Sequence, residues 1–201
     1  LIVHHYIKGT TTKLADDETS EARAGDSYTT NPKLDLNKYE LEKDDTGNLV
    51  MPSNAVGTYS DGTTEVTYYY VEKEIPLTVH HYIEGTTTSL AEDETIEGKV
   101  GDEYTTSVAT VDNKYELVST PANATGTMVK DQTVVIYYYK LKDTSVLVHH
   151  YVKDTTTKLS EDVTINGKVD DKYTTTVASD IPEYYDIVAE PSNKNGTMTK
   201  D

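Results

Sequence analysis

Histidine is the residue type in this chain best suited to bind a metal ion or to exchange protons near neutral pH. All six histidines occur in three copies of the tripeptide His-His-Tyr, which begin at His4, His80 and His149. Adjacent residues of a β-strand point to opposite faces of the sheet, so His80 and His81 cannot bind one ion together without a bulge. We therefore predict that His81 packs inward with a backbone hydrogen-bond partner, that His80 lies at the surface, and that the tripeptides form no metal site.

Two acidic segments contain the oxygen ligands that calcium prefers. They are residues 92–94 and the segment around Asp44, Asp45 and Asn48. Calcium takes roughly six to eight oxygen ligands, and neither segment matches a known calcium-loop spacing. Solvated hairpins that keep the protein soluble and protect strand edges are the favoured interpretation. Asp44, Asp45 and Asn48 are the better calcium candidates of the two segments.

No group of residues in the sequence predicts catalysis. An enzyme needs a nucleophile, a base and an orienting group, or paired carboxylates in a cleft. The histidines lie on a predicted strand without a Ser or Asp partner at a recognisable spacing, the sequence has no Cys, and Gly-rich phosphate loops are absent. We predict that the protein is not an enzyme and that it uses no cofactor.

A self-formed amide bond between Lys and Asn is another chemistry to consider. Three asparagines recur in register: Asn54, Asn123 and Asn193. The recurring Lys99 and Lys168 are matched by Arg23 in the first copy, and an Arg cannot form that bond. We therefore interpret the asparagines as turn residues whose side chains hydrogen-bond to the backbone.

The charge of the chain restricts its partners. The 201 residues include 18 Lys and Arg and 35 Asp and Glu, which gives a net charge of −17. A protein that binds phosphate groups needs clustered Lys and Arg, so we exclude nucleic acid as a partner. No apolar run reaches the roughly 18 residues that span a bilayer, so we predict no membrane insertion. Tyr occurs 17 times while Phe and Trp are missing, and Tyr must therefore supply the aromatic bulk of any core.

The rest of the sequence repeats together with the His-His-Tyr tripeptide. An acidic patch, the motif Asp-x-Tyr-Thr-Thr and the motif Pro-x-Asn-x-x-Gly-Thr follow each tripeptide in the same order. The second tripeptide begins 76 residues after the first and the third 69 residues after the second, because the first copy has a seven-residue insertion around residues 44–48. Each copy is one structural unit. We predict three domains: 1–74, 75–141 and 142–201.

Within a repeat the hydrophobic residues recur at every second position, which is typical of β-strands. Four residues form the predicted core face of the opening strand in the second repeat: Leu77, Val79, His81 and Ile83. Further strands are expected at 94–100, 115–118 and 133–139, the last of which is matched by 65–70. Residues 105–113 predict an irregular or briefly helical crossing. The predicted fold class is mainly β, and α+β at most.

The predicted links between repeats are six residues long, at 71–76 and 140–145. They contain no Gly or Ser run, and Pro76 stiffens the first, so they favour a semi-stiff, elongated string of repeats. The third repeat stops before a Tyr-rich closing strand, so we expect an unpaired sheet edge there and either reduced order or pairing with another molecule. We interpret the chain as part of a longer protein in which it is monomeric.

The ordered set of motifs resembles the MucBP (mucin-binding protein) repeats of Gram-positive surface proteins. The motifs are Gly-Asp-x-Tyr-Thr-Thr, Tyr-Glu-Leu-Val, Pro-x-Asn-x-x-Gly-Thr and a closing Thr-Val-x-x-Tyr-Tyr-Tyr strand. The resemblance covers nearly the whole chain as three tandem copies. It implies ubiquitin-like β-grasp domains in extracellular, cell-wall-anchored adhesins, some of which bind mucin glycans. The His-His-Tyr tripeptide departs from the usual first strand of the family, and Asp170 replaces Gly25 and Gly101 of the other copies.

Exposed tyrosines beside threonines form the kind of surface that binds carbohydrate. Alternation along the closing strands leaves at least one ring of each Tyr triplet facing solvent, and the candidate contact residues are Tyr69, Tyr138, Thr67 and Thr133. The expected partner is a host mucin or another glycoprotein or glycan, and the charge of −17 favours neutral sugars over anionic chains. The alternative is a purely structural stalk that projects a distal adhesive domain from the cell wall.

Overall fold

The computed structural model describes residues 1–130 and 134–200. These residues form sixteen β-strands and no helix, so the predicted mainly β class is confirmed. Residues 106–112 are irregular, which is one of the two forms expected for the crossing at 105–113. The Thr- and Val-rich composition of that segment explains the outcome, because these residues have low helix propensity. Nothing in the described part of the chain has the length and apolarity of a membrane-spanning helix.

Contacts between segments divide the chain into two compact units. The first contains residues 1–79, 94–106 and 122–135, and the second contains residues 80–93, 107–121 and 136–201. The division passes through the second repeat because two of its strands contribute residues to both units. The domain limits drawn from the sequence stay predictions.

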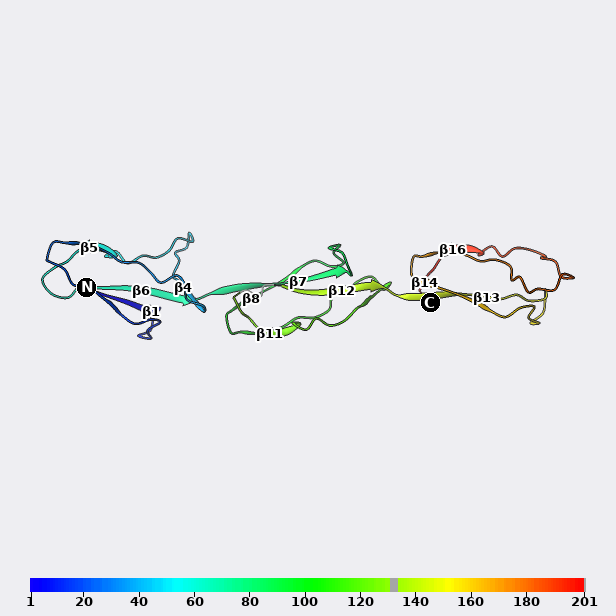
Figure 1. The fold of residues 1–201 in the computed structure, drawn as a ribbon, viewed down its shortest axis with the longest axis horizontal. Coiled ribbons are helices and arrows are strands. Elements are labelled where there is room, and N and C mark those ends of the chain that lie inside the picture. Colours follow the sequence, from blue (N-terminus) through cyan, green and yellow to red (C-terminus); the bar gives the residue numbers. More distant parts are fainter. Residues whose placement is uncertain (131–133, 201) are drawn as a thin grey trace. The chain divides into compact units, whose positions relative to one another are not determined.

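The first repeat is built on a sheet of four strands. In sheet order these are β2 (Glu18–Thr19), β1 (Ile2–Ile7), β6 (Glu65–Glu72) and β4 (Tyr39–Leu41). β1 and β6 lie side by side in parallel, with Val3 opposite Val66, and the two outer strands are antiparallel to their neighbours (Figure 1). The opening and closing strands of the repeat are therefore direct neighbours. No helix crosses this sheet in the described residues, so its assignment as a β-grasp domain stays a prediction.

A pair of short antiparallel strands, β3 (Ser27–Thr29) and β5 (Val56–Thr58), packs against this sheet. The sequence did not predict these strands, because each has only three residues and its neighbours are turn-forming and polar. The Tyr28 ring lies across Gly57, and its hydroxyl donates a hydrogen bond to the Asn54 carbonyl at 3.2 Å. A side chain at position 57 would occupy the space that the Tyr28 ring fills.

The second repeat has the same two parts. Its sheet contains, in order, β10 (Tyr115–Leu117), β12 (Val134–Leu141), β7 (Glu74–Ile83) and β8 (Glu94–Lys99), and its short pair is β9 (Glu103–Thr105) with β11 (Thr125–Thr127). The strands predicted at 94–100, 115–118 and 133–139 are confirmed apart from their ends. Thr133 itself lies outside the described residues.

Tyrosine supplies much of the bulk of the two cores. Two tyrosines of β6 and two of β12 are buried: Tyr68, Tyr70, Tyr137 and Tyr139. The opening strand of the second repeat is buried at three of its four predicted core positions: Leu77, Val79 and His81. The hydrophobic alternation in the sequence therefore identified the inner face of the sheet correctly. Burial of large rings stabilises a core, provided that their hydroxyl groups find hydrogen-bond partners.

The third repeat differs from the others at its sheet. β13 (Asp143–Val148) pairs with β14 (Val163–Lys168), and the short pair is β15 (Lys172–Thr174) with β16 (Asn195–Thr197). Among the described residues β13 has no strand partner on its other edge, as expected. Val146 and Val148 are only half-buried, whereas Leu77 and Val79 at the matching positions are buried.

Two aspartates of the third repeat replace glycines of the other copies at turns. Asp154 and Asp170 have left-handed backbones with φ of 61° and 74°, and Gly85 and Gly101 at the matching positions of the second repeat also have positive φ. Asp adopts this conformation more readily than most other residues with a side chain. The replacement of Gly by Asp170 therefore keeps the turn.

The predicted six-residue links between repeats are wrong. β6 ends at Glu72 and β7 begins at Glu74, so Lys73 alone lies between them, and Lys142 alone lies between β12 and β13. The strands continue because their ends have partners in the sheets: Glu72 pairs with Tyr39, and Glu74 pairs with Lys99. Ladder hydrogen bonds thus continue into segments that the sequence suggested were linkers.

The contact between Tyr28 and Gly57 makes a test of the fold. A Cβ atom at position 57 would lie 2.7 Å from the Tyr28 hydroxyl oxygen, so Gly57→Ala must displace the ring. We expect urea denaturation to show a loss of about 1–3 kcal/mol in the free energy of unfolding, as is usual for overpacking. The neighbouring Thr58→Ala change, at an exposed position, is the control and should stay within about 0.5 kcal/mol of the original protein. Equal stability of the Gly57→Ala protein would contradict the observed packing.

Candidate functional site

Strand alternation exposes the middle ring of each described Tyr triplet. Tyr69 is 44% exposed and Tyr138 is 38% exposed, whereas the rings on either side of each are buried. The prediction that one ring of each triplet faces solvent is therefore confirmed. A contact between these two rings and a bound molecule stays a prediction.

The outer face of the first sheet gathers polar and aromatic groups around Tyr69. Thr67 lies on the same face, two residues before Tyr69. The parallel register places Tyr6 next to Tyr69 and His4 next to Thr67. In the second repeat Ile136 occupies the position of Thr67, and Thr133 lies outside the described residues. The first repeat is therefore the one in which the predicted contact residues lie together.

A groove of about 310 Å³ lies beside the Tyr69 ring. It is lined by one loop and the outer face of β6: Val50, Met51, Pro52, Ser53, Asn54, Glu65, Thr67 and Tyr69. The Asn54 side-chain amide donates a hydrogen bond to the Glu65 carbonyl at 2.9 Å, which fastens the loop to the start of β6. Asn123 makes the same bond to Val134 in the second repeat at 3.1 Å. The predicted side-chain to backbone bonds of Asn54 and Asn123 are confirmed, although they reach the closing strand and not only their own turn.

The insertion of the first repeat leads into this groove and contains the calcium candidates. One oxygen of Asp44 accepts hydrogen bonds from the Thr46 hydroxyl at 2.7 Å, the Thr46 backbone N–H at 2.9 Å and the Asn48 backbone N–H at 3.0 Å. These bonds, above all that from the Thr46 hydroxyl, lower the pKa of Asp44. Asp45 and Asn48 are exposed. Nowhere in residues 1–130 and 134–200 do three or more His, Cys, Asp or Glu gather into a group that could hold a metal ion. The interpretation of this segment as a solvated hairpin stays a prediction, and calcium binding by Asp44, Asp45 and Asn48 stays the less favoured alternative.

The first histidine of each tripeptide belongs to a cluster that the sequence analysis missed. Its Nδ1 atom lies within 2.7–2.9 Å of an aspartate oxygen, and its ring stacks on the tyrosine two residues later, with ring centroids 5.1–5.5 Å apart. We call these the Asp-His-Tyr clusters: Asp17, His4 and Tyr6; Asp93, His80 and Tyr82; Asp162, His149 and Tyr151. In all three copies the Asp follows the His by thirteen residues, and that constant spacing was the signal in the sequence.

The second histidine of each tripeptide points inward. His5 Nδ1 lies 2.8 Å from the Tyr70 hydroxyl, and His81 Nδ1 lies 3.0 Å from the Tyr139 hydroxyl. The tyrosine hydroxyl is a partner of His81 that the sequence did not predict, and the closing strand supplies it. The backbone partner predicted for His81 stays a prediction. In the third repeat His150 does have a backbone partner, since its Nε2 accepts from the Ala178 N–H at 3.1 Å.

Burial controls the protonation of His5. Desolvation lowers the pKa of His5 below its ordinary value of 6.5, and the nearby Glu18 carboxylate opposes this shift only in part. The His5 side chain is fully buried, and a charged imidazole there would lose its hydration. The neutral form is therefore favoured in the folded protein.

Three segments of the chain match the MucBP domain family: residues 2–71, 76–140 and 145–201. The chain belongs to the MucBP family, and the resemblance drawn from the motifs is confirmed. It is a tandem-repeat region of the kind found in Gram-positive surface proteins.

Two relatives match almost the whole chain. Internalin J of Listeria monocytogenes serotype 4b (strain F2365) is 36% identical over 200 residues, and Internalin J of serovar 1/2a (strain ATCC BAA-679 / EGD-e) is 32% identical over 201 residues. Both alignments cover 97% of this chain, but they cover only 20% and 22% of the relatives. The chain thus spans about a fifth of the length of these proteins. Among solved structures, the Streptococcal High Identity Repeats in Tandem (SHIRT) domains 3-4 from a cell surface protein match with 14% identity and a TM-score of 0.25, over 70% of this chain and 98% of that one.

The lowered pKa of His5 predicts a loss of stability in mild acid. The unfolded chain takes up a proton near pH 6.5 while the folded chain does not, so this part of the stability is complete above that pH. It decreases as the pH falls from 6.5 towards the lower pKa of the folded state. We expect the melting temperature of the first repeat to fall between pH 7.5 and 5.5, and His5→Asn to flatten that decrease. An NMR titration of the His5 ring should give a midpoint below 6.5, and a midpoint at or above that value would refute the assignment.

Proposed function

We propose that the chain is an extracellular, non-catalytic repeat region that contacts neutral sugars of host mucin or another glycoprotein through the outer face of the first sheet. The proposal includes attachment of the parent protein to the cell wall and the three predicted repeats as domains. The observation that supports it is the exposed Tyr69 ring beside a groove with Thr67 and Ser53 on its wall. The family name gives a reason to test mucin first.

The groove has the groups that sugar recognition needs. An aromatic face covers the apolar side of a sugar ring, and hydroxyl and amide groups nearby exchange hydrogen bonds with its hydroxyls. The Tyr69 ring offers the first, and the hydroxyl groups of Thr67 and Ser53 offer the second. The Glu65 carboxylate can also accept hydrogen bonds from sugar hydroxyls. A volume of about 310 Å³ is at the small end for ligand sites, so a short segment of glycan fits this site better than a long one.

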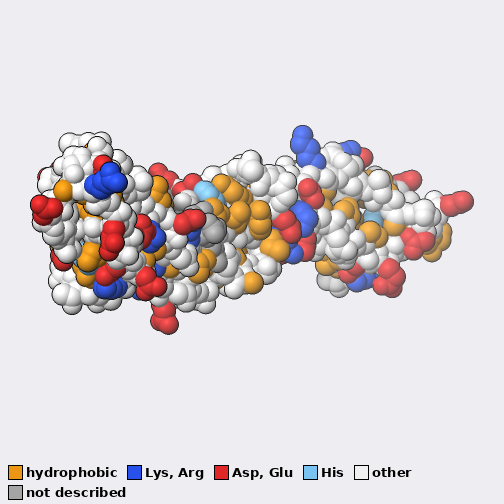
Figure 2. Space-filling model, turned by 60° about the vertical axis from the view of Figure 1, so that its left-hand side comes forward, with side chains coloured by type: hydrophobic (Ala, Val, Ile, Leu, Met, Phe, Trp, Pro, Cys, Tyr) orange, Lys and Arg blue, Asp and Glu red, His pale blue; other side chains and the backbone are white. Residues whose placement is uncertain are grey.

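The net negative charge of the protein favours neutral glycans over anionic ones. Acidic side chains are spread over the face shown in Figure 2 and outnumber the basic ones there, in keeping with the net charge of −17. Such a surface repels sialylated or sulfated chains at low ionic strength. One shallow groove binds weakly, but a mucin carries many glycans and the parent protein can carry many repeats, so binding gains from multivalency.

A pull-down with mucin tests the proposal. The whole chain and its Tyr69→Ala variant are immobilised and exposed to mucin from which sialic acid has been removed. We expect the variant to bind about tenfold more weakly, because removal of an aromatic anchor costs a large part of the binding energy. Tyr184→Ala is the matched control, since Tyr184 is 81% exposed and lies outside the sheets. Equal losses of mucin binding in both variants would mean that exposed tyrosines bind mucin non-specifically, and they would contradict a site at Tyr69.

The structural stalk is the second candidate, and the links support it. Lys73 and Lys142 are the single residues between strands of successive repeats, and their N–H groups donate hydrogen bonds to the carbonyls of Lys38 and Lys114 at 3.0 and 2.9 Å. Links this short restrict motion between repeats. A stalk needs restricted motion between its repeats, and it does not need a ligand-binding groove.

Spin labels can test the stalk directly because the chain has no native Cys. Glu21→Cys and Thr110→Cys place labels at exposed positions in the first and second repeats. We expect a narrow distance distribution in the original protein and a clearly broader one after insertion of Gly-Ser-Gly-Ser behind Lys73. A distribution that is already broad without the insertion argues against the stalk.

A further inference from the structure

The three Asp-His-Tyr clusters differ at one neighbouring position. The residue that pairs with the cluster tyrosine across the hairpin is Lys13 in the first repeat, Ser89 in the second and Lys158 in the third. The hairpins are otherwise built alike, with the same Thr hydroxyl bonds inside the turn. The second repeat is thus a natural Lys-to-Ser variant of the same structure.

In the first and third repeats the lysine completes the cluster. Lys13 Nζ lies 2.6 Å from Asp17 Oδ2, and Lys158 Nζ lies 2.6 Å from Asp162 Oδ2. Each aspartate therefore has one oxygen on the histidine and the other on an ammonium group. The lysine is the main reason that the pKa values of Asp17 and Asp162 are lowered. Both aspartate side chains are 24% exposed.

In the second repeat the ammonium group is missing. The Ser89 hydroxyl donates to the Ala91 carbonyl, and in the described part of the chain no Lys or Arg pairs with Asp93. Asp93 Oδ1 still lies 2.7 Å from His80 Nδ1, but the Asp93 side chain is 47% exposed, about twice as much as its two counterparts. Among the described residues His80 Nδ1 has no hydrogen-bond partner, so the carboxylate lies close to the imidazole but is open to solvent.

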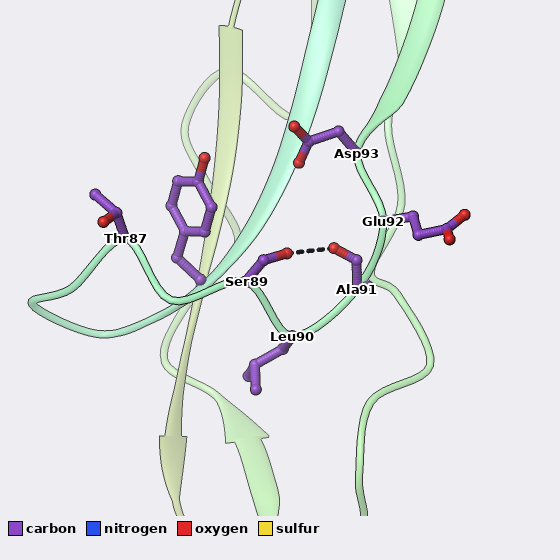
Figure 3. A pocket seen from close by; sticks show the side chains of 7 residues that line it. Thr87, Ser89, Leu90, Ala91, Glu92 and Asp93 are labelled. Atoms are coloured by element: carbon purple, nitrogen blue, oxygen red, sulfur yellow. Dashed lines mark hydrogen bonds between the residues drawn. The ribbon is translucent and has the colours of Figure 1, made fainter.

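A shallow pocket lies beside Ser89, the residue at the position of Lys13 and Lys158. It has a volume of about 630 Å³ and is lined by the Tyr82 ring and the hairpin: Tyr82, Thr87, Ser89, Leu90, Ala91, Glu92 and Asp93. Figure 3 shows the Asp93 carboxylate turned back towards the strands, the Glu92 carboxylate pointing outward, and Ser89 bonded to Ala91. The Tyr82 ring, the Leu90 side chain and the Asp93 carboxylate thus border the same shallow, open pocket.

We propose that this pocket binds a primary ammonium group on an alkyl stem, namely the lysine side chain of a partner polypeptide, in the place that Lys13 and Lys158 fill in the other repeats. The same backbone hairpin holds such a group 2.6 Å from the matching aspartate twice in this chain. The alkyl stem packs on the Tyr82 ring and Leu90, as lysine stems do on apolar surface. The net charge of −17 steers a basic partner towards the surface. The site and its occupant are independent of the sugar contact proposed at Tyr69.

NMR titration of the whole chain with n-butylammonium chloride tests the site. The titration uses low salt, with potassium chloride as the ionic-strength control. We expect saturable shifts at Tyr82, Leu90 and Asp93 with a Kd of roughly millimolar size, because exposed ion pairs are weak. The corresponding residues of the first repeat, where Lys13 fills the place, should not shift. n-Butanol, which has the stem without the charge, should bind at least several-fold more weakly.

Three variants add or remove the lysine and the carboxylate on which the proposal depends. Ser89→Lys installs the residue of the other two repeats, so it should fold normally and abolish the shifts. Asp93→Asn should abolish them by removing the charge. Lys13→Ser should create the same response at Tyr6 and Asp17 in the first repeat. Melting curves of the three variants show whether each is folded.

Several results would overturn the proposal. Butylammonium binding by folded Ser89→Lys as strong as that of the original chain would show that the lysine position is not the site. Equal shifts with n-butanol would show an apolar pocket without ammonium recognition. Glucosamine hydrochloride, which carries its ammonium on a sugar ring, should bind more weakly than butylammonium, and tighter binding would replace the lysine side chain by an amino sugar as the occupant.

Discussion

Hydrogen bonds between the opening and closing strands organise the first two repeats, although these strands come from opposite ends of each repeat. In the first repeat the parallel register sets Tyr6 beside Tyr69 and His5 beside Tyr68. That register places the side chains of His5 and two tyrosines in the core. It places the side chains of His4, Tyr6 and Tyr69 on the outer face of the sheet. A shift by one residue would exchange the two faces, so the core and the surface chemistry are specified together.

The third repeat shows what this pairing contributes. Among the described residues its opening strand has a neighbour on one side only, and the valines that should be in the core are half-buried. His150 accepts a hydrogen bond from a backbone N–H, while His5 and His81 contact a tyrosine hydroxyl of the closing strand. The Asp-His-Tyr cluster persists in all three repeats, even though β13 ends at Val148, because its members lie in one short segment of the chain and need no residue of a closing strand.

Period-two hydrophobicity predicted the long strands, the inner face of the opening strand and at least one exposed ring in each Tyr triplet. It left open which phase of the triplet faces solvent, and the structure exposes Tyr69 and Tyr138. It missed the short pairs, such as β3 with β5, because three residues carry too little pattern and their pairing depends on the fit of Tyr28 over Gly57, which is a tertiary contact. It also made the links too long, since Glu72 and Glu74 look like linker residues until their sheet partners are known. The groove beside Tyr69 was beyond the sequence, because it needs the loop at 50–54 to return to β6.

The parallel pairing of β1 with β6 has a mechanical consequence. When the two ends of the first repeat are drawn apart, the pull acts along these strands in opposite directions, because one lies at the start of the repeat and the other at its finish. The hydrogen bonds between the two strands are then loaded in shear and must break nearly together. In a hairpin that is pulled apart at its open end, by contrast, the hydrogen bonds break one after another. A repeat of this design is suited to carry tension without losing its shape.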